Sequence, residues 1–350
     1  MKIFWRDFTR QYWKQATVIK NIFAHLITER EIFDALIHAS ENILQDESIR
    51  LRLYSGKIGK DAKEQFELLP TKNDDSFTDF LQRYLAVTEE SEVCLILNHL
   101  QRHCAPEVWF RIRKFLEALY PFIGIPSSTA DMVVFLGNYA ATPFGVHYDY
   151  ASVMSLVIAG CKRFLVWPAE FFKAENFEID PINHSIQDLD ISLYREYATE
   201  VVGYPGDIIF LPERAWHIAV SDPNFNLSVS IGLFNNEVPT HDSLDMLTRF
   251  SASGFKIIPA LRNPIKIFSN NKFISSGFKI IWIKNNDVIY YAINGHLFKY
   301  FYSENIEKIA KLINQKNKFQ VADILKFGDE NLIKDFLQKI YQARGIEISS

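Results

Sequence analysis

Two histidines and one aspartate are the residues of this chain whose types and spacing best suit chemistry. His147 and Asp149 come just after the turn Thr142-Pro-Phe-Gly145, and residues two apart in an extended chain point to the same face. His217 ends a later segment, Leu-Pro-Glu-Arg-Ala-Trp-His, that follows a β-rich run. If the two segments lie side by side, two imidazoles and a carboxylate meet. That ligand set binds Fe(II) and leaves open positions for a cosubstrate and O2.

A lysine follows His147 on what we expect to be the neighbouring strand. Lys162 lies between two apolar runs, where a cation is costly unless an anion accompanies it. A bound dicarboxylate such as 2-oxoglutarate could chelate iron with one end and pair with Lys162 at the other. The alternative is that Lys162 or Arg163 extends to solvent from the end of a hairpin. Strand alternation allows only one of the two to face inwards.

The elements that must position these residues form a β-rich centre flanked by helices. Short β-rich runs separated by Gly and Pro turns indicate an antiparallel sandwich or barrel; they lie at 132–136, 153–158, 163–167, 207–211 and 227–231. Before them the chain is mainly helical. The apolar spacing predicts a helix near residues 3–12, Thr28 and Glu31 form a capping-box pattern at the start of a second helix, and Pro106 suits the first turn of a third.

The last 110 residues differ in composition from the rest. They carry 16 Lys and Arg against 10 Asp and Glu, a balance of +6, so residues 1–240 carry −10 of the total of −4. The pattern predicts a helical linker at 241–262, a hairpin, and helices at 304–315, 319–326 and 330–342. We therefore predict a catalytic domain at 1–240 (helical entry 1–105, barrel core 106–240), a helical linker at 241–270 and a winged-helix-like module at 271–350.

Composition excludes several classes of protein. Hydrophobic residues make up 48% of the 350 residues and charged residues 23%, which is typical of a globular chain. Three cysteines without paired spacing do not form a disulfide framework and favour a reducing compartment. Neither a secretory signal nor a membrane-spanning run is visible, so we expect a cytoplasmic protein without a membrane partner. The modest positive balance of the tail makes a nucleic-acid partner an unfavoured interpretation.

Three segments together carry a family resemblance: residues 138–149 (NYAATPFGVHYD), 156–168 (LVIAGCKRFLVWP) and 204–217 (YPGDIIFLPERAWH). They resemble the JmjC/cupin-like Fe(II)/2-oxoglutarate oxygenases, both the asparaginyl hydroxylase of hypoxia-inducible factor and the ribosomal oxygenases. The strongest match covers about residues 130–235. The flanking helices and tail favour the ribosomal-oxygenase (cupin-4) branch. The resemblance implies a mixed α and β fold with a double-stranded β-helix (jelly-roll) core, and a homodimer formed through the linker.

The resemblance also implies roles for particular residues. It makes His147, Asp149 and His217 the iron ligands and Lys162 the anchor of the far carboxylate of 2-oxoglutarate. Further candidates for contact with the cosubstrate are Asn138, Tyr139, Thr142, Ser228 and Ser230. Tyr148 and Trp216 are candidates for the mouth of the site, where a substrate binds, although packing aromatics explain them equally well.

The function that follows is hydroxylation of a protein or peptide side chain, coupled to conversion of 2-oxoglutarate and O2 to succinate and CO2. A ribosomal protein and a genetically encoded precursor peptide are both candidate substrates. One alternative is a hydroxylase of small molecules. Another is a cupin-like binding protein without turnover, whose tail binds nucleic acid. Lysine demethylation uses the same iron chemistry, but neither a reader module nor a zinc-type cysteine cluster supports a role in chromatin.

Overall fold

The computed structural model describes residues 2–22, 25–55, 58–88, 90–175, 177–180, 184–186, 189–220, 224–235 and 242–349. The chain forms two compact units, Met1–Asn236 and Glu237–Ser350, and each has sheets of its own. The domain boundary that we predicted at residue 240 lies outside the described residues, as does the first residue of the predicted linker.

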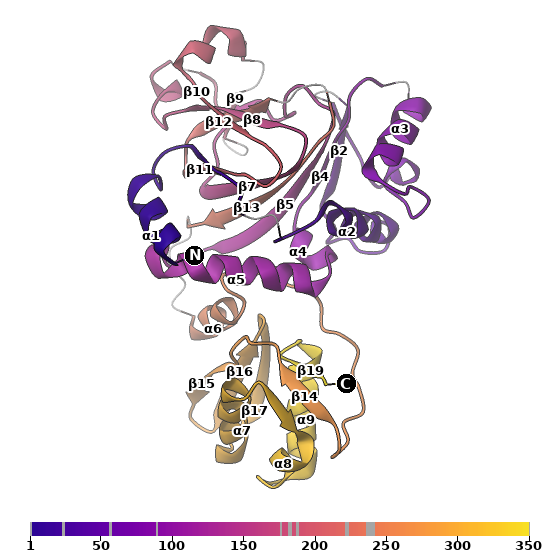
Figure 1. Ribbon diagram of the computed structural model, residues 1–350, viewed down its shortest axis with the longest axis vertical. Helices are drawn as coiled ribbons and strands as arrows, with labels where there is room; N and C mark the ends of the chain where they lie inside the picture. Colours follow the sequence, from indigo (N-terminus) through magenta and orange to yellow (C-terminus); the bar gives the residue numbers. More distant parts are fainter. Residues whose placement is uncertain are drawn as a thin grey trace. The chain divides into compact units, whose positions relative to one another are not determined.

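Two antiparallel sheets form the centre of the first unit (Figure 1). The larger sheet has eight strands in the order β1 (Thr17–Ile19), β11 (Ile208–Leu211), β7 (Ala151–Ala159), β13 (Asn226–Phe234), β5 (Thr129–Gly137), β4 (Cys94–Leu97), β2 (Leu51–Ser55) and β3 (Ile58–Lys60). The smaller sheet has five, in the order β10 (Thr199–Gly203), β8 (Lys162–Trp167), β12 (Trp216–Val220), β6 (Val146–His147) and β9 (Ser185–Ile186). The predicted class, mixed α and β with an antiparallel jelly-roll core, is confirmed.

An apolar cluster with members from both sheets joins them. Its buried members are Ala151, Val153, Val157, Phe164, Val166, Val201, Ile209, Leu211, Ala215 and Ala219. Many are β-branched residues, which suit the pleated surface of a strand. Burial of this cluster therefore fixes which residues of each strand face the space between the sheets, because a shift of one residue would turn every side chain to the other face.

Five α-helices of the first unit precede or flank the first core strands: α1 (Lys2–Gln11), α2 (Glu29–Asn42), α3 (Phe77–Thr88), α4 (Leu100–His103) and α5 (Pro106–Ile123). Both halves of the predicted capping box form, since Thr28 accepts from the Glu31 amide while Glu31 accepts from the Thr28 amide. Trp5 of α1 packs 5.0 Å from Phe115 of α5, and Phe8 packs 5.2 Å from Phe210 of β11. Helix α1 thereby joins α5 to the larger sheet. Short 3-10 turns lie at Phe66–Leu68, Phe172–Glu175, Ile191–Leu193 and Arg195–Tyr197.

The described residues of the second unit form two three-stranded antiparallel sheets and four α-helices. The sheets are β18 (Lys318–Gln320), β14 (Lys272–Ser275), β19 (Ile346–Ile348), and β15 (Ile281–Asn285), β16 (Val288–Ile293), β17 (His296–Phe301). The helices are α6 (Ser243–Ser251), α7 (Glu304–Gln315), α8 (Val321–Leu325) and α9 (Glu330–Gln342). The hairpin and helices α7 and α9 lie where the sequence predicted them, whereas the helix predicted at 319–326 is confined to Val321–Leu325 because Phe319 and Gln320 belong to β18. Assignment of this unit to the winged-helix class stays a prediction.

The predicted helical linker is helical only in its first part. Helix α6 ends at Ser251, and Ser253 and Gly254 then adopt positive φ values of 54° and 93°, which an α-helix does not contain. Pro259 and Pro264 follow and oppose a restart of the helix. Within the part of the chain that the structure describes, no helix combines the length and apolar character needed to cross a bilayer.

Candidate metal centre

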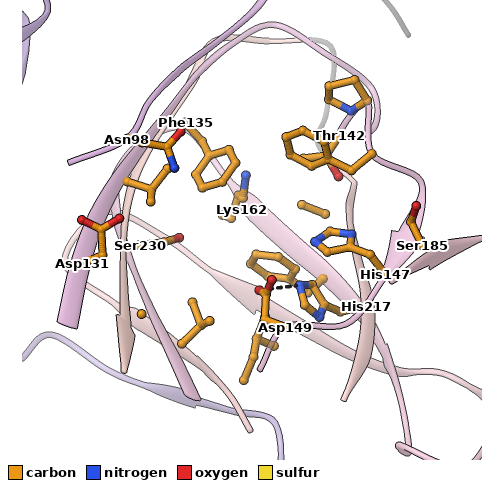
Figure 2. A pocket seen from close by; sticks show the side chains of 18 of the residues that line it. Asn98, Asp131, Phe135, Thr142, His147, Asp149, Lys162, Ser185, His217 and Ser230 are labelled. Atoms are coloured by element: carbon orange, nitrogen blue, oxygen red, sulfur yellow. Dashed lines mark ion pairs between the residues drawn. The ribbon is translucent and has the colours of Figure 1, made fainter. Parts of the chain in front are cut away.

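His147 and His217 are directly opposite each other on neighbouring strands. His147 of β6 is the register partner of His217 of β12, and their ring centroids lie 4.4 Å apart. Asp149 follows β6 by two residues, and its Oδ2 lies 3.7 Å from Nε2 of His217. One ligand atom from each of the three residues lies within 4.8 Å of the others, and the side chains converge in Figure 2. The two segments therefore lie side by side, which is the condition under which the sequence predicted a metal cluster.

Each imidazole is hydrogen-bonded to the backbone carbonyl of the residue two positions before it in the sequence. Nδ1 of His147 lies 3.0 Å from the carbonyl oxygen of Gly145, and Nδ1 of His217 lies 2.9 Å from that of Ala215. A carbonyl oxygen only accepts hydrogen bonds, so each Nδ1 carries the proton and donates it. The lone pair of each Nε2 is then free for a metal ion, which is the way protein backbones orient metal-binding histidines.

The two ends of the triad differ in exposure. His217 is buried, and desolvation together with the neighbouring His147 lowers the pKa of its imidazole to about 4, so His217 stays neutral at neutral pH and keeps its lone pair. The Asp149 side chain is 42% exposed. Its backbone oxygen accepts a hydrogen bond of 2.8 Å from the Arg214 amide, which ties it to the turn before β12. A metal ion at this cluster would therefore be held by the segment of His147 and Asp149 and by the segment of His217, which this hydrogen bond ties together.

A cavity of about 430 Å³ lies between the two sheets and contains this cluster. Its lining comes from both sheets and from the turn before β6. The residues are Arg52, Tyr54, Asn98, Asp131, Val133, Phe135, Thr142, Pro143, Phe144, His147, Asp149, Val153, Lys162, Phe164, Ser185, Leu211, His217, Ala219, Ser230, Gly232 and Phe234. Its volume is that of a pocket for a small molecule or for one side chain of a larger substrate.

Lys162 is a buried cation on the wall of this cavity. Only 2% of its surface is exposed, and its ammonium group donates a 2.8 Å hydrogen bond to the hydroxyl of Tyr139. Desolvation lowers its pKa to about 8. Among the residues that the structure describes, no carboxylate lies within ion-pair distance of it, whereas Arg163 on the opposite face pairs with Glu200. Of the two adjacent cations, the lysine is therefore the one that faces inwards and can accept an anion from the cavity.

The residues around Lys162 fit an organic anion together with a metal ion. Nζ of Lys162 lies 5.2 Å from the ring centroid of Phe135 and 5.6 Å from that of Phe164, so the ammonium group is held in an aromatic enclosure. The hydroxyls of Thr142 and Ser228 are buried and find no hydrogen-bond partner among the described residues. Buried polar groups are normally paired. Of these two residues Thr142 lines the cavity and the cosubstrate candidate Ser228 does not. The buried cation and the unpaired Thr142 hydroxyl on one cavity wall fit a dicarboxylate.

The remaining cosubstrate candidates fall into three positions. Thr142 and Ser230 line the cavity, and the Ser230 hydroxyl donates to Ser155 at 3.3 Å. Tyr139 does not line it and reaches it only through its bond to Lys162. The amide of Asn138 is used by the backbone, since it accepts from the Val93 amide and donates to the Ser91 carbonyl. Asn138 is therefore placed as a link between the β5 end and the segment before β4.

The structure places the two aromatic candidates for the mouth outside the cavity. Trp216 is fully buried and donates to the Ala169 carbonyl at 3.1 Å, while the Tyr148 ring packs 4.7 Å from it. Both belong to an apolar cluster with Leu165 and Phe172, and neither lines the cavity. The reason is strand alternation. A residue next to an inward-facing histidine must face outwards, so both aromatics pack in the outer cluster and not on the cavity wall, and their contact with substrate stays a prediction.

Sequence reasoning missed several lining residues. Asp131 and Phe135 share the face of β5, while Arg52 and Asn98 come from β2 and the end of β4. Alternation along β5 gave a signal, because Asp131 is a charged residue at the start of an otherwise apolar strand. Arg52 and Asn98 gave no signal, since only strand order brings the entry region to the cavity.

Comparison with known proteins defines the class. Residues 114–240 match the family model of the JmjC domain, and this range contains all three residues of the metal cluster. Residues 114–240 thus match a JmjC domain, and the predicted likeness to the Fe(II)- and 2-oxoglutarate-dependent oxygenases is confirmed. No curated protein matches the chain.

Solved structures give a similar fold at low sequence identity. An X-ray structure of Escherichia coli ycfD has a TM-score of 0.50 at 13% identity, over 99% of this chain and 98% of that one. Structures of YcfD, a ribosomal oxygenase from the same organism, in complex with cobalt and succinic acid or with cobalt and 2-oxoglutarate have TM-scores of 0.49 at 14% and 12% identity, with the same coverage. At this identity the likeness concerns the fold alone.

Proposed function

We propose that this chain hydroxylates a side chain of a protein or peptide, with Fe(II) held by His147, Asp149 and His217 and 2-oxoglutarate held by Lys162. One observation carries the proposal. The cross-strand pair of histidines and a buried lysine without a carboxylate partner among the described residues line the same cavity. A metal triad alone would suit many reactions, but a triad next to a lone buried cation is suited to a metal-chelating dicarboxylate.

The residues of this chain have distinct tasks in that reaction. The iron would supply activation of O2 and oxidation of a substrate C–H bond as 2-oxoglutarate is converted to succinate and CO2. His147 and His217 would present their Nε2 lone pairs, since their Nδ1 protons are engaged by carbonyls. Lys162, positioned by Tyr139, would pair with the far carboxylate and orient the keto acid. Phe135, Phe164 and the other apolar lining residues would keep water from the reacting atoms.

Charge supports a protein or peptide as the substrate. Residues 1–240, which contain the cavity, carry a balance of −10, and such a surface attracts basic segments. The sequence resemblance to the ribosomal-oxygenase branch points to the same class. A ribosomal protein and a precursor peptide are both candidate substrates.

We also propose a cellular compartment and an oligomeric state for this enzyme. We place it in the cytoplasm, since its three cysteines suit a reducing compartment, and we propose that it is a homodimer through residues 241–270 without a nucleic-acid partner. The mass of the full chain in solution, measured by light scattering, tests the dimer. A monomer across the accessible concentration range would refute it.

The function is tested by following 2-oxoglutarate and peptide together. We expect Fe(II)-dependent formation of succinate by the full chain, and its loss in His147→Ala. Peptides that raise succinate formation should gain the mass of one oxygen atom. Loss of the mass gain in Lys162→Met, with restoration at high 2-oxoglutarate, would tie the product to the proposed anchor. A chain that binds metal but forms no succinate would refute the oxygenase proposal, and oxidation of small molecules alone would refute the peptide substrate.

A further inference from the structure

A second groove adjoins the cavity that contains the metal cluster. Its volume is about 570 Å³, and it is formed by the C-terminus of α2, the start of β2, the loop after β3 and the segment between β4 and α4. Arg52 and Asn98 line both the groove and the cavity, so the two spaces meet at these residues. The groove therefore offers a small molecule a route into the cavity.

Cations outnumber carboxylates on the lining of this groove. Arg50, Arg52 and Lys63 line it, and among the described residues Asp61 is the carboxylate that accompanies them. All three cations are exposed residues. Within the described ranges, no carboxylate lies within ion-pair distance of any of them, and Asp61 accepts instead from the backbone amide of Lys63 at 2.8 Å. The positive charge of the groove is thus not neutralised by ion pairs with these residues.

The sign of this charge is the reverse of that of the surrounding chain. Residues 1–240 carry a balance of −10. The described lining of the cavity itself is balanced, with the cations Arg52 and Lys162 against the carboxylates Asp131 and Asp149. A cleft lined by charges of one sign focuses their field and raises the local concentration of a counter-ion. A dianion in solution is therefore repelled by the chain as a whole and attracted to the groove.

A wall of aromatic rings joins the groove to Lys162. The Arg52 guanidinium donates to Asn98 at 3.1 Å and lies 5.3 Å from the ring centroid of Phe144. The Phe144 ring lies 6.5 Å from that of Phe135, whose centroid is 5.2 Å from Nζ of Lys162. Figure 2 shows Asn98 at the end of the cavity where Phe135 and Lys162 are labelled. The path from Arg52 to Lys162 is therefore lined by rings rather than by carboxylates.

Given the oxygenase activity proposed above, we infer that this groove is the access route of the 2-oxoglutarate dianion. Arg50 and Lys63 attract the dianion from solvent, and Arg52 attracts it to the junction with the cavity, where Lys162 receives its far carboxylate. Arg50 and Lys63 are positioning residues, since they raise the rate of association and do not contact the bound cosubstrate. Because steering acts through a long-range field, its signature is an association rate that falls with ionic strength.

The kinetics of 2-oxoglutarate binding test this without turnover. The full chain loaded with Fe(II) is mixed with 2-oxoglutarate in the absence of O2, and stopped-flow absorbance follows chelation of the iron by the keto acid. The rate constants kon and koff are measured at ionic strengths of about 0.01 M and 1 M, where the Debye length is about 30 Å and 3 Å. We expect kon of the wild type to fall at least about tenfold between the two conditions.

A double variant assigns the steering to the groove. In Arg50→Gln/Lys63→Gln we expect kon at low ionic strength to fall roughly three- to tenfold, with koff and the affinity for Fe(II) unchanged. The matched control is Arg6→Gln/Lys173→Gln, which removes two positive charges from exposed positions on α1 and on the turn Phe172–Glu175. The net charge changes equally in both variants, so the control should keep kon within about twofold of the wild type.

The outcomes that overturn the inference differ from the one that refutes the oxygenase. Equal slowing of both double variants would assign the effect to total charge. A wild-type kon that ignores ionic strength, or wild-type kon in the groove variant, would show that the dianion enters elsewhere. A change confined to koff would make the groove part of the bound site, and weaker peptide binding with unchanged kon would assign it to the substrate. Failure of the iron-loaded wild type to chelate 2-oxoglutarate would refute the proposed function itself.

Discussion

The two sheets that face the cavity provide different kinds of residue. The five-stranded sheet supplies His147, His217 and Lys162, whose polar atoms are fixed by backbone carbonyls or by Tyr139. The eight-stranded sheet supplies Asp131, whose Oδ1 accepts a hydrogen bond from the side chain of Gln101. The wall formed by the five-stranded sheet thus carries the groups that we propose to bind iron and 2-oxoglutarate, and the opposite wall adds a carboxylate that those two roles do not use.

The largest expected effect comes from removing one ligand of the metal cluster on the five-stranded sheet. His147→Ala removes one of three ligands, and we expect formation of succinate to fall at least about 100-fold, because changes that only reorient a ligand already cost 10–100-fold. Succinate is measured by NMR and bound iron by absorption after chelation. His38→Ala, on an exposed position of α2, is the control and should leave both unchanged. Full activity of His147→Ala would show that the cluster is not the iron site.

Replacing the buried Lys162 should weaken the binding of 2-oxoglutarate without lowering the free energy of unfolding. In Lys162→Met we expect the Kd for 2-oxoglutarate to rise roughly 10–100-fold, the loss of a charged hydrogen bond. The free energy of unfolding of the metal-free protein should stay the same or rise, because an unpaired buried charge is removed. Calorimetry with Mn(II) and urea denaturation measure the two quantities. Lys173→Met, an exposed lysine, should alter neither. Parallel losses in both would point to a structural role instead.

The pH dependence of 2-oxoglutarate binding also distinguishes the effect of Lys162 on affinity from its effect on stability. Burial lowers the pKa of Lys162 to about 8, and only the protonated form attracts a carboxylate. The affinity for 2-oxoglutarate should therefore be constant below pH 8 and fall above it, by about tenfold per pH unit. Since the unfolded chain binds this proton more tightly, the metal-free protein should gain stability as pH rises above 8. Titrations of wild type and Lys162→Met with metal occupancy held constant check this; an affinity that rises with pH would contradict it.

The smallest expected effect concerns the outer face of the five-stranded sheet. Trp216 donates to the Ala169 carbonyl and faces away from the cavity. Trp216→Phe should lower the free energy of unfolding by about 1–2 kcal/mol through the lost hydrogen bond and packing. The KM values for 2-oxoglutarate and peptide should not change. Urea denaturation and steady-state kinetics measure these. Unchanged stability together with a raised KM would return Trp216 to the mouth of the site.

Local patterns predicted the elements that carry strong signals of their own. The capping box at Thr28, the turn-bounded strands of the core and the helices at 304–315 and 330–342 were all visible from spacing. The linker was predicted too long because the helix-ending signals of Gly254 and of the two prolines that follow it were not applied. The outward position of Trp216 followed from strand alternation once His217 was taken to face inwards, so that misplacement was avoidable.

The sequence by itself determined the identity of the reactive groups: two histidines, one aspartate and a lysine among apolar runs, in segments that must be strands. Only the tertiary structure decided which strands are neighbours, because pairing depends on the packing of the whole core rather than on local spacing. That pairing makes His147 and His217 cross-strand partners. It also brings Asp131, more than eighty residues before His217 along the chain, to the cavity of the metal cluster.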